Sequence, residues 1–329
     1  MDGNYPAIFE NLPASIDSEL IRSNRLASRA DETKRALLRN WTGFISWCER
    51  QGLISLPAHP DAVELYLLYL ADKHPVLDRS GKLIRHGQKT SAVCQALWAI
   101  NTGHRLAGHS PPGETELIKT AIAGIKRRKG MRKKQQAPMT IDHFREIPFG
   151  MDLKGKRNKA LLLVGFAGCL RRSELVALNV EDIEEAPYGL RLYLASSKTD
   201  QEGAGAWVDV LSATLFPEVC PVQTLKDWME SADIRSGAVF RSLTRGRSPR
   251  IRGRLSAVSV DAVVKWAAAL IGLNPALYGG HSLRAGKATY LSEHGKSPVT
   301  IAKHGRWKSL DMVLTYCRGE TARELEGVY

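Results

Sequence analysis

The chain has 329 residues, 43% of them hydrophobic, which is long enough for two domains with packed cores and too apolar for a disordered polymer. Its 47 Lys and Arg against 34 Asp and Glu give a net charge of +13, which favours a polyanionic partner such as nucleic acid. Five scattered cysteines, no leader-like start and no bilayer-length apolar run argue against a disulfide framework, a thiolate zinc site, secretion and membrane spanning, and predict a soluble intracellular protein.

The first third of the chain carries a helical pattern. Residues 1–25 lack a clear pattern and are expected to be a flexible lead-in. Apolar residues then recur at helical spacing over 31–50, 61–73, 90–108 and 114–130. Asp61 is the expected N-cap of the second helix, and Gly108 ends the third. With no β signal in this region, the sequence predicts a purely helical domain over 26–130.

A run of basic residues follows this helical region. Seven of the nine residues from Lys126 to Lys134 are Lys or Arg, and a proline closes the stretch at 138. Such a run is commonly the solvated end of a helix. Between two folded regions of a basic protein it also suits a linker that lies along phosphates, and we favour that interpretation for 131–138. The residues expected to contact DNA here are Lys126, Arg127, Arg128, Lys129, Arg132, Lys133 and Lys134.

The second region, 139–329, is predicted to be mainly helical with one small sheet. Thr140 caps a short helix, and a buried helix spans 156–170. Leucines at 190, 192 and 194 alternate with other residues, and a Gly-rich turn separates them from AWVDVL at 206–211, which predicts a β-hairpin. Further helices are expected over 221–231, 257–271, 282–294, 297–305 and 309–318.

A second arginine-rich stretch lies at 241–254. It holds six arginines and no acidic residue, which makes it a candidate loop for phosphate contacts. The residues expected to contact DNA in this loop are Arg245, Arg247 and Arg250.

Two pairs of residues in the second region carry the types that bind anions. Arg171 and Glu174 are three apart, and so are His281 and Arg284, so each pair shares one face of a helix. A surface salt bridge and a capping histidine would explain them structurally. Two guanidinium groups could also hold phosphate oxygens bidentately, with Lys198 as a third cation at the tip of the predicted hairpin. Both interpretations remain open from the pairs alone.

The stretch HGRWKSLDMVLTYCRG, 304–319, raises the same question. Its apolar residues recur at helical spacing, so it can be interpreted as one more amphipathic helix. It also places Tyr316, a possible nucleophile, nine residues after Trp307. Cys317 fits the apolar stripe and is expected to serve packing.

Taken in chain order, these residues resemble those of one enzyme family. Arg171-x-x-Glu174, a lysine in a hairpin, His281-x-x-Arg284, Trp307 and Tyr316 resemble the tyrosine recombinases, also called phage integrases. The resemblance spans the chain. It implies a helical core-binding domain over 26–130, a catalytic domain over 139–329, and a C-shaped clamp of the two domains on DNA.

The resemblance also implies an activity. The enzyme would cleave and rejoin DNA strands at specific sites through a 3′-phosphotyrosyl intermediate, and exchange strands through a Holliday junction, with no metal, ATP or other cofactor. Tyr316 would be the nucleophile and His281 the acid and base that serves it, because the tyrosine pKa is about 10. Lys198 would protonate the leaving 5′-oxygen.

The remaining members of the set would support this chemistry. Arg171 and Arg284 would stabilise charge on the non-bridging oxygens. Trp307, whose indole can only donate, would hydrogen-bond a phosphate oxygen. Glu174 would hold Arg171 or His281 in place.

The implied partner is double-stranded DNA with paired inverted-repeat half-sites, bound by a homotetramer that is a monomer when free and that has no membrane contact. The implied setting is the DNA-associated cytoplasm of a prokaryote, in a phage or plasmid system. Two alternatives stay open. A type IB topoisomerase or telomere resolvase shares the residue set, and a site-specific binding or architectural protein would explain the charge without cleavage.

Overall fold

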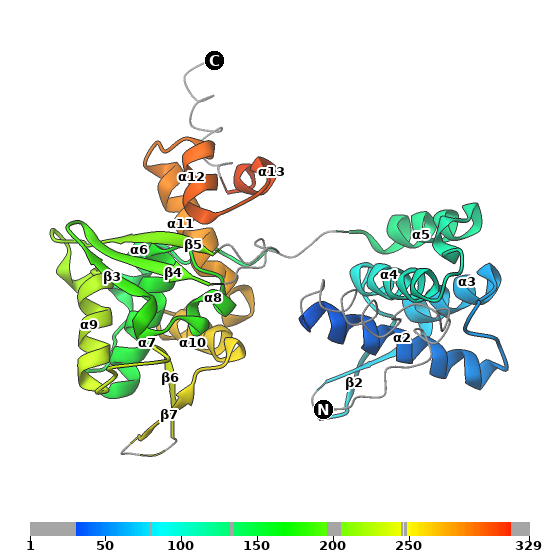
Figure 1. Ribbon diagram of the computed structural model, residues 1–329, viewed down its shortest axis with the longest axis horizontal. Helices are drawn as coiled ribbons and strands as arrows, with labels where there is room; N and C mark the ends of the chain where they lie inside the picture. The colour runs from blue at the N-terminus through cyan, green and yellow to red at the C-terminus, as the bar shows by residue number, and fades with distance from the viewer. Residues whose placement is uncertain are drawn as a thin grey trace, which may run out of the picture. The chain divides into compact units, whose positions relative to one another are not determined.

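The computed structural model describes residues 31–78, 80–131, 135–195, 205–244, 246 and 249–316. The chain divides into two compact units, Met1–Lys133 and Lys134–Tyr329. In both, helices dominate and the sheets are small and antiparallel (Figure 1), so the expected mainly-α fold class is confirmed. Each unit buries its own hydrophobic cluster. No helix among the described residues is long and apolar enough to cross a bilayer.

In the described part of the first unit, four α-helices pack around large aromatic residues. They are α2 (Asp31–Gln51), α3 (Pro60–Leu68), α4 (Thr90–Leu106) and α5 (Glu116–Lys129), and α3 runs on into a π-helical turn, Tyr69–Lys73. The buried Phe44 ring of α2 contacts Trp41 of the same helix and Tyr66 of α3. Gly103 lets α4 approach, because a Cβ there would lie 2.7 Å from the Trp41 ring. The expected helices are all present.

Two details of this unit differ from the sequence prediction. The expectation of no β-structure is wrong, because β1 (Pro75–Leu77) and β2 (Leu83–His86) form an antiparallel pair. Asp78 makes the turn: its Oδ1 accepts the backbone N–H of Ser80 at 2.8 Å and of Lys82 at 3.0 Å. The strands are three and four residues long and mostly exposed, so their pattern carries little periodic signal.

The start of α3 is the other difference. The N-cap is His59 rather than Asp61, and the His59 side chain accepts the Asp61 N–H at 3.3 Å. Pro60 fixes this boundary, because proline favours the first helical position and leaves Asp61 inside the first turn.

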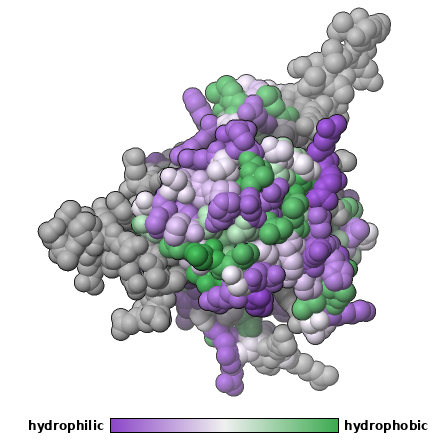
Figure 2. All heavy atoms as spheres, turned by 90° about the vertical axis from the view of Figure 1, so that its right-hand side faces the viewer, coloured by the Kyte–Doolittle hydropathy of each residue, from purple (hydrophilic) through white to green (hydrophobic). Residues whose placement is uncertain are grey.

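Apolar side chains also reach the surface of the first unit. Leu65 of α3, Trp98 of α4 and Leu117 of α5 are more than a third exposed. Figure 2 views the molecule from the side on which α3 and α5 lie in Figure 1, and shows hydrophobic patches among hydrophilic ones.

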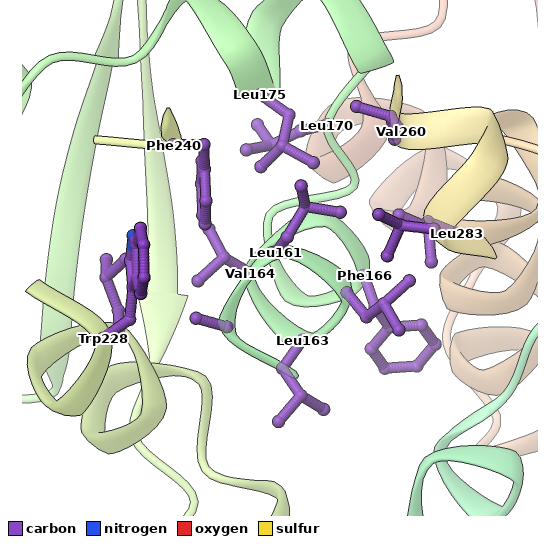
Figure 3. Packing of buried hydrophobic residues seen from close by; sticks show 14 of the residues in the cluster. Leu161, Leu163, Val164, Phe166, Leu170, Leu175, Trp228, Phe240, Val260 and Leu283 are labelled. Atoms are coloured by element: carbon purple, nitrogen blue, oxygen red, sulfur yellow. The ribbon is translucent and has the colours of Figure 1, made fainter. Parts of the chain in front are cut away.

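The second unit is built around one buried helix. Its helices are α6 (Ile141–Glu146), α7 (Leu153–Ala167), α8 (Arg172–Ala177), α9 (Pro221–Ser231), α10 (Ala257–Leu270), α11 (His281–Glu293), α12 (Pro298–Gly305) and α13 (Leu310–Leu314). The second half of helix α7 is apolar and buried, and its Leu161 and Val164 lie in one hydrophobic cluster with Trp228 of α9 and Leu283 of α11 (Figure 3). A second, smaller cluster joins α11, α12 and α13 around Ile301 and Val313.

Two sheets lie beside these helices. The predicted hairpin is confirmed as β4 (Gly189–Leu194) and β5 (Ala206–Leu211), and β3 (Ile183–Ala186) adds a third strand in the order β3-β4-β5. Leu190, Leu192 and Leu194 face the core, as their alternation predicts. The arginine-rich loop forms a second hairpin from β6 (Arg241–Leu243) and β7 (Ile251–Arg254).

Helix α11 is held by the segment that enters the second unit. The Ala137 N–H donates to Leu277 O at 2.9 Å, and the Met139 N–H donates to Ser282 O at 3.0 Å. Gly286 makes this approach possible, because a Cβ there would lie 1.9 Å from Met139 O. The first turns of α11 are thereby fixed by backbone contacts.

Candidate active site

A short contact in the candidate site joins His281 to Tyr316. His281 is the first residue of α11, and its Nε2 lies 2.7 Å from Tyr316 Oη. Tyr316 lies in a turn, because α13 ends at Leu314, before the end of the 309–318 helix that the sequence predicts. The Thr315 hydroxyl donates to the Met312 carbonyl at 2.7 Å, and the Tyr316 N–H donates to Val313 O at 2.8 Å. These bonds tighten the chain and aim the phenol at the imidazole.

Trp307 packs between the tyrosine and an arginine. Its ring centroid lies 5.9 Å from that of Tyr316, and the Arg284 guanidinium carbon lies 4.5 Å above its ring. Gly305 makes room for the indole, because a Cβ at this position would lie 1.7 Å from it. The tryptophan thus orients both neighbours.

Arg284 is buried, with 2% of its surface exposed. Its guanidinium donates to Gly305 O at 2.8 Å through Nη2, and to Cys169 O through Nη1. Cys169 adopts φ = 48°, which is uncommon for a residue other than glycine and turns the chain just before Arg171. The turn at 168–170 therefore holds Arg284 in place.

Glu174 holds Arg171 at the start of α8. The Glu174 side chain is 1% exposed; Oε1 accepts from Arg171 Nη1 at 2.5 Å, and Oε2 accepts the Arg171 backbone N–H at 2.8 Å. Arg172 points elsewhere and pairs with Asp261, whose other oxygen accepts the Gly280 N–H at 2.6 Å. Glu174 thus fixes the backbone and the side chain of Arg171 together.

The pKa values of three groups are shifted by this arrangement. Burial, together with the guanidinium groups of Arg284 and Arg171, lowers the pKa of His281. Burial raises the pKa of Tyr316, and Arg284 offsets this only in part. Burial also acts to raise the pKa of Glu174, but Arg306 and the hydrogen bonds from Arg171 outweigh it, so that the pKa is lowered. At neutral pH the site therefore holds a neutral imidazole, a neutral phenol and a carboxylate.

The structure brings most of the predicted site residues into one connected cluster. Contacts run from Tyr316 to His281 and Trp307, from Trp307 to Arg284, and through the 168–170 turn to the pair at the start of α8. The predicted residues in this cluster are Arg171, Glu174, His281, Arg284, Trp307 and Tyr316. Lys198 and Cys317 lie outside the described residues.

Some of the residues expected to contact DNA are exposed, some contact other parts of the protein, and some lie outside the described residues. On α5, Lys126 and Arg127 are exposed, whereas Arg128 pairs with Asp72 at 2.9 Å and the Lys129 ammonium donates to Ala71 O. In the β6–β7 hairpin Arg250 is exposed. Arg132, Lys133, Lys134, Arg245 and Arg247 lie outside the described residues. The basic runs therefore serve partly to hold the fold.

Several residues near the site were missed by the sequence reasoning. Arg306 donates to Glu174 Oε2 at 2.8 Å, and Gln136 Oε1 accepts the His281 backbone N–H at 3.0 Å. His304 is half-buried, and this desolvation lowers its pKa to about 4; its Nε2 lies 2.9 Å from Ala167 O. Lys287 lies over the Phe166 ring at 5.3 Å. Each acts through a long-range contact, and no local spacing marks it.

The whole chain is similar to known proteins of one family. The model of the phage integrase family matches residues 133–323. An integrase/recombinase XerD homolog of Selenomonas ruminantium is 35% identical over 295 residues, which covers 88% of this chain and 82% of the relative. Recombinase Cre of Escherichia phage P1 is 23% identical over 344 residues, covering 96% and 94%.

Solved structures share the fold at low sequence identity. The Tn1549 transposon integrase in complex with transposon right-end DNA aligns with a TM-score of 0.62 and 13% identity, covering 93% of this chain and 97% of that one. A lambda integrase dimer bound to a COC′ core site aligns with a TM-score of 0.53 and 19% identity, covering 92% and 77%.

Proposed function

The chain belongs to the phage integrase family, that of the tyrosine recombinases, and from that premise we propose that Tyr316 is the residue that cleaves the DNA strand. Membership makes the chain a site-specific recombinase, an enzyme that transfers DNA strands, and confirms the resemblance found in the sequence. The observation that carries the proposal for Tyr316 is the 2.7 Å contact between its Oη and His281 Nε2.

The proposed step exchanges one phosphodiester for another. Tyr316 Oη attacks the phosphorus of the scissile phosphate and gives its proton to His281 Nε2. A bond forms between Oη and phosphorus, and the bond from phosphorus to the 5′-oxygen breaks, leaving a 3′-phosphotyrosyl link. The lowered pKa of His281 supports this role, because an imidazole that is neutral at pH 7 has a free lone pair for the proton. Reversal of the step by a 5′-hydroxyl rejoins the strand.

The electrostatics of the cluster fit a phosphodiester in the transition state. Glu174 accepts hydrogen bonds from Arg171 and Arg306, and Arg284 lies close enough to this carboxylate to interact with its charge, so three guanidinium groups gather in the cluster. A guanidinium carries more N–H donors than the two that Arg284 gives to the carbonyl groups of Cys169 and Gly305, so Arg284 can also donate to a phosphate oxygen. Pre-oriented cations of this kind stabilise charge that develops on the non-bridging oxygens.

Lys198 and Trp307 complete the proposal. Lys198 is proposed to protonate the leaving 5′-oxygen, on the family resemblance alone. Trp307 is proposed to donate its indole N–H to a phosphate oxygen. Its stacking on Arg284 supports a role in holding that arginine as well.

The substrate and assembly follow from the same premise. Double-stranded DNA is the partner, since the family acts on DNA and the chain carries +13 charges. We propose paired inverted-repeat half-sites, a homotetramer on DNA formed from free monomers, a core-binding domain over 26–130, a linker over 131–138 and a catalytic domain over 139–329. The division of the chain between Lys133 and Lys134 supports these boundaries. We also propose a phage- or plasmid-type setting in the prokaryotic cytoplasm.

A nicked suicide substrate tests the proposal. Cleavage next to the nick releases a short 5′-hydroxyl fragment, which traps the covalent intermediate. The unmodified protein is expected to form an SDS-stable adduct, and Tyr316→Phe is expected to bind the same DNA without forming it. An adduct formed by Tyr316→Phe would remove Tyr316 from the reaction.

A further inference from the structure

Arg306 occupies a backbone conformation that normally selects glycine. It follows α12 with φ = 56° and ψ = 44°, in the left-handed region that costs an L-residue other than glycine roughly 1–2 kcal/mol. The position is a helix C-cap, where glycine or asparagine is the usual residue. A residue kept in a strained conformation between Gly305 and Trp307 calls for a compensating contact of its side chain.

The side chain of Arg306 supplies such contacts, and all of them are local to the candidate active site. Nη2 donates to Glu174 Oε2 at 2.8 Å and to Cys169 O at 3.3 Å, and Nη1 donates to Gly168 O and His304 O, both at 3.3 Å. The side chain is 14% exposed. One guanidinium thus ties the turn before α8 to the turn after α12.

We propose that Arg306 is a positioning residue for strand cleavage, which acts through Glu174 to hold Arg171 against the scissile phosphate. The inference rests on the proposed function of the site. Glu174 Oε2 receives two donors, the Arg171 backbone N–H and Arg306, while Oε1 receives the Arg171 guanidinium. Removal of Arg306 leaves a 1% exposed carboxylate with one cation instead of two and frees the 168–170 turn that also anchors Arg284.

The contacts favour positioning over direct phosphate binding. Four acceptors of the protein surround the two terminal nitrogens of Arg306, and its Nε is buried without a partner among the described residues. Arg306 is therefore held inside the protein by its own chain. Its effect on the substrate has to pass through the groups it contacts.

Arg306→Gly tests this inference cleanly, because glycine relaxes the left-handed backbone while removing the guanidinium. We expect the variant to bind DNA with unchanged affinity and to form the covalent adduct at least about tenfold more slowly at saturating DNA, since Arg171 loses its fixed orientation. Arg306→Lys keeps the charge but not the planar set of donors, and its rate of adduct formation is expected to lie between those of the parent protein and Arg306→Gly. Arg235→Ala removes an exposed arginine paired with Asp233 and serves as the matched control for charge, with a rate unchanged from the parent.

A double-mutant cycle with Glu174→Gln separates positioning from general destabilisation. If Arg306 acts through Glu174, the rate loss of the double variant is clearly smaller than the product of the two single losses. A rate loss of the double variant that equals the product of the two single losses would overturn the inference. An Arg306→Gly variant that cleaves at the parent rate would overturn it as well. If Arg306→Gly does not fold, Arg306→Lys is used in the same cycle and is judged by the same criteria. Failure of the proposed function can be told apart from failure of this inference, because in the first case the unmodified protein itself forms no adduct through Tyr316.

Discussion

At the scale of single residues, the site depends on the protonation state of His281. Burial, Arg284 and Arg171 all disfavour the imidazolium, so the pKa of His281 lies below its ordinary value of 6.5. Tyr316, whose pKa is raised, faces it at 2.7 Å and cannot ionise by itself at neutral pH. A base that is neutral at pH 7 is what a phenol nucleophile needs.

The pH dependence of cleavage follows from these shifts. The rate of adduct formation at saturating DNA is expected to be flat through neutral pH and to fall only on the acid side of 6.5, where His281 gains a proton and can no longer accept one. The control variant His294→Asn, at the exposed end of α11, is expected to show the same fall in rate at acid pH. A rate that already falls with decreasing pH above 7 would contradict the assigned base.

At the scale of elements, the site depends on how closely α11 lies on the segment that enters the second unit. Gly286→Ala places a Cβ 1.9 Å from Met139 O, so the helix has to move away. We expect a loss of about 1–3 kcal/mol in the free energy of unfolding, the usual range for overpacking, together with slower adduct formation. Chemical denaturation measures the first quantity and the nicked substrate the second.

Gly124→Ala is the control for this substitution. Gly124 is also helical, on α5, and nothing lies within 4 Å of a Cβ built there. Alanine is expected to be neutral or to stabilise by up to about 1 kcal/mol. Equal effects of the two changes would show that the backbone approach at Met139 is unimportant.

The individual helices and strands show how far the sequence could predict the fold. The β4–β5 hairpin was predictable, because its leucines alternate over six residues and face a core. The β1–β2 hairpin was missed, because its short strands are mostly exposed and only Asp78 and Gly81 mark the turn. Helix α13 was predicted too long, because the side-chain bond of Thr315 that ends it is invisible in a pattern of apolar residues.

The candidate site shows the same division between local and long-range information. The contact of Arg171 with Glu174 follows from a spacing of three residues at a helix start. The contact of His281 with Tyr316 spans 35 positions, and only the family resemblance linked the two residues. Arg306 could not be found at all, because a left-handed C-cap predicts glycine and carries no sign of a buried ion pair.

At the scale of the whole molecule, the charge of +13 predicts DNA affinity that falls steeply with salt. Two exposed basic residues of α5, Lys126 and Arg127, test which charges matter. Replacing Lys126 and Arg127 together by alanine is expected to reduce the slope of log affinity against log salt by about 0.9 for each phosphate that the protein no longer neutralises. Lys119→Ala, on the same helix but paired with Glu116 at 2.7 Å, is expected to leave the slope unchanged. An unchanged slope in the double variant would place the DNA-contacting surface elsewhere.

The central claim about the molecule is that one tyrosine forms the covalent link to DNA. The most direct measurement is to digest the trapped adduct with protease and nuclease and to locate the attached nucleotide by mass spectrometry. The account predicts a single modified peptide with a 3′-phosphate ester on Tyr316. A nucleotide attached to any other residue, or linked through its 5′-phosphate, would contradict it.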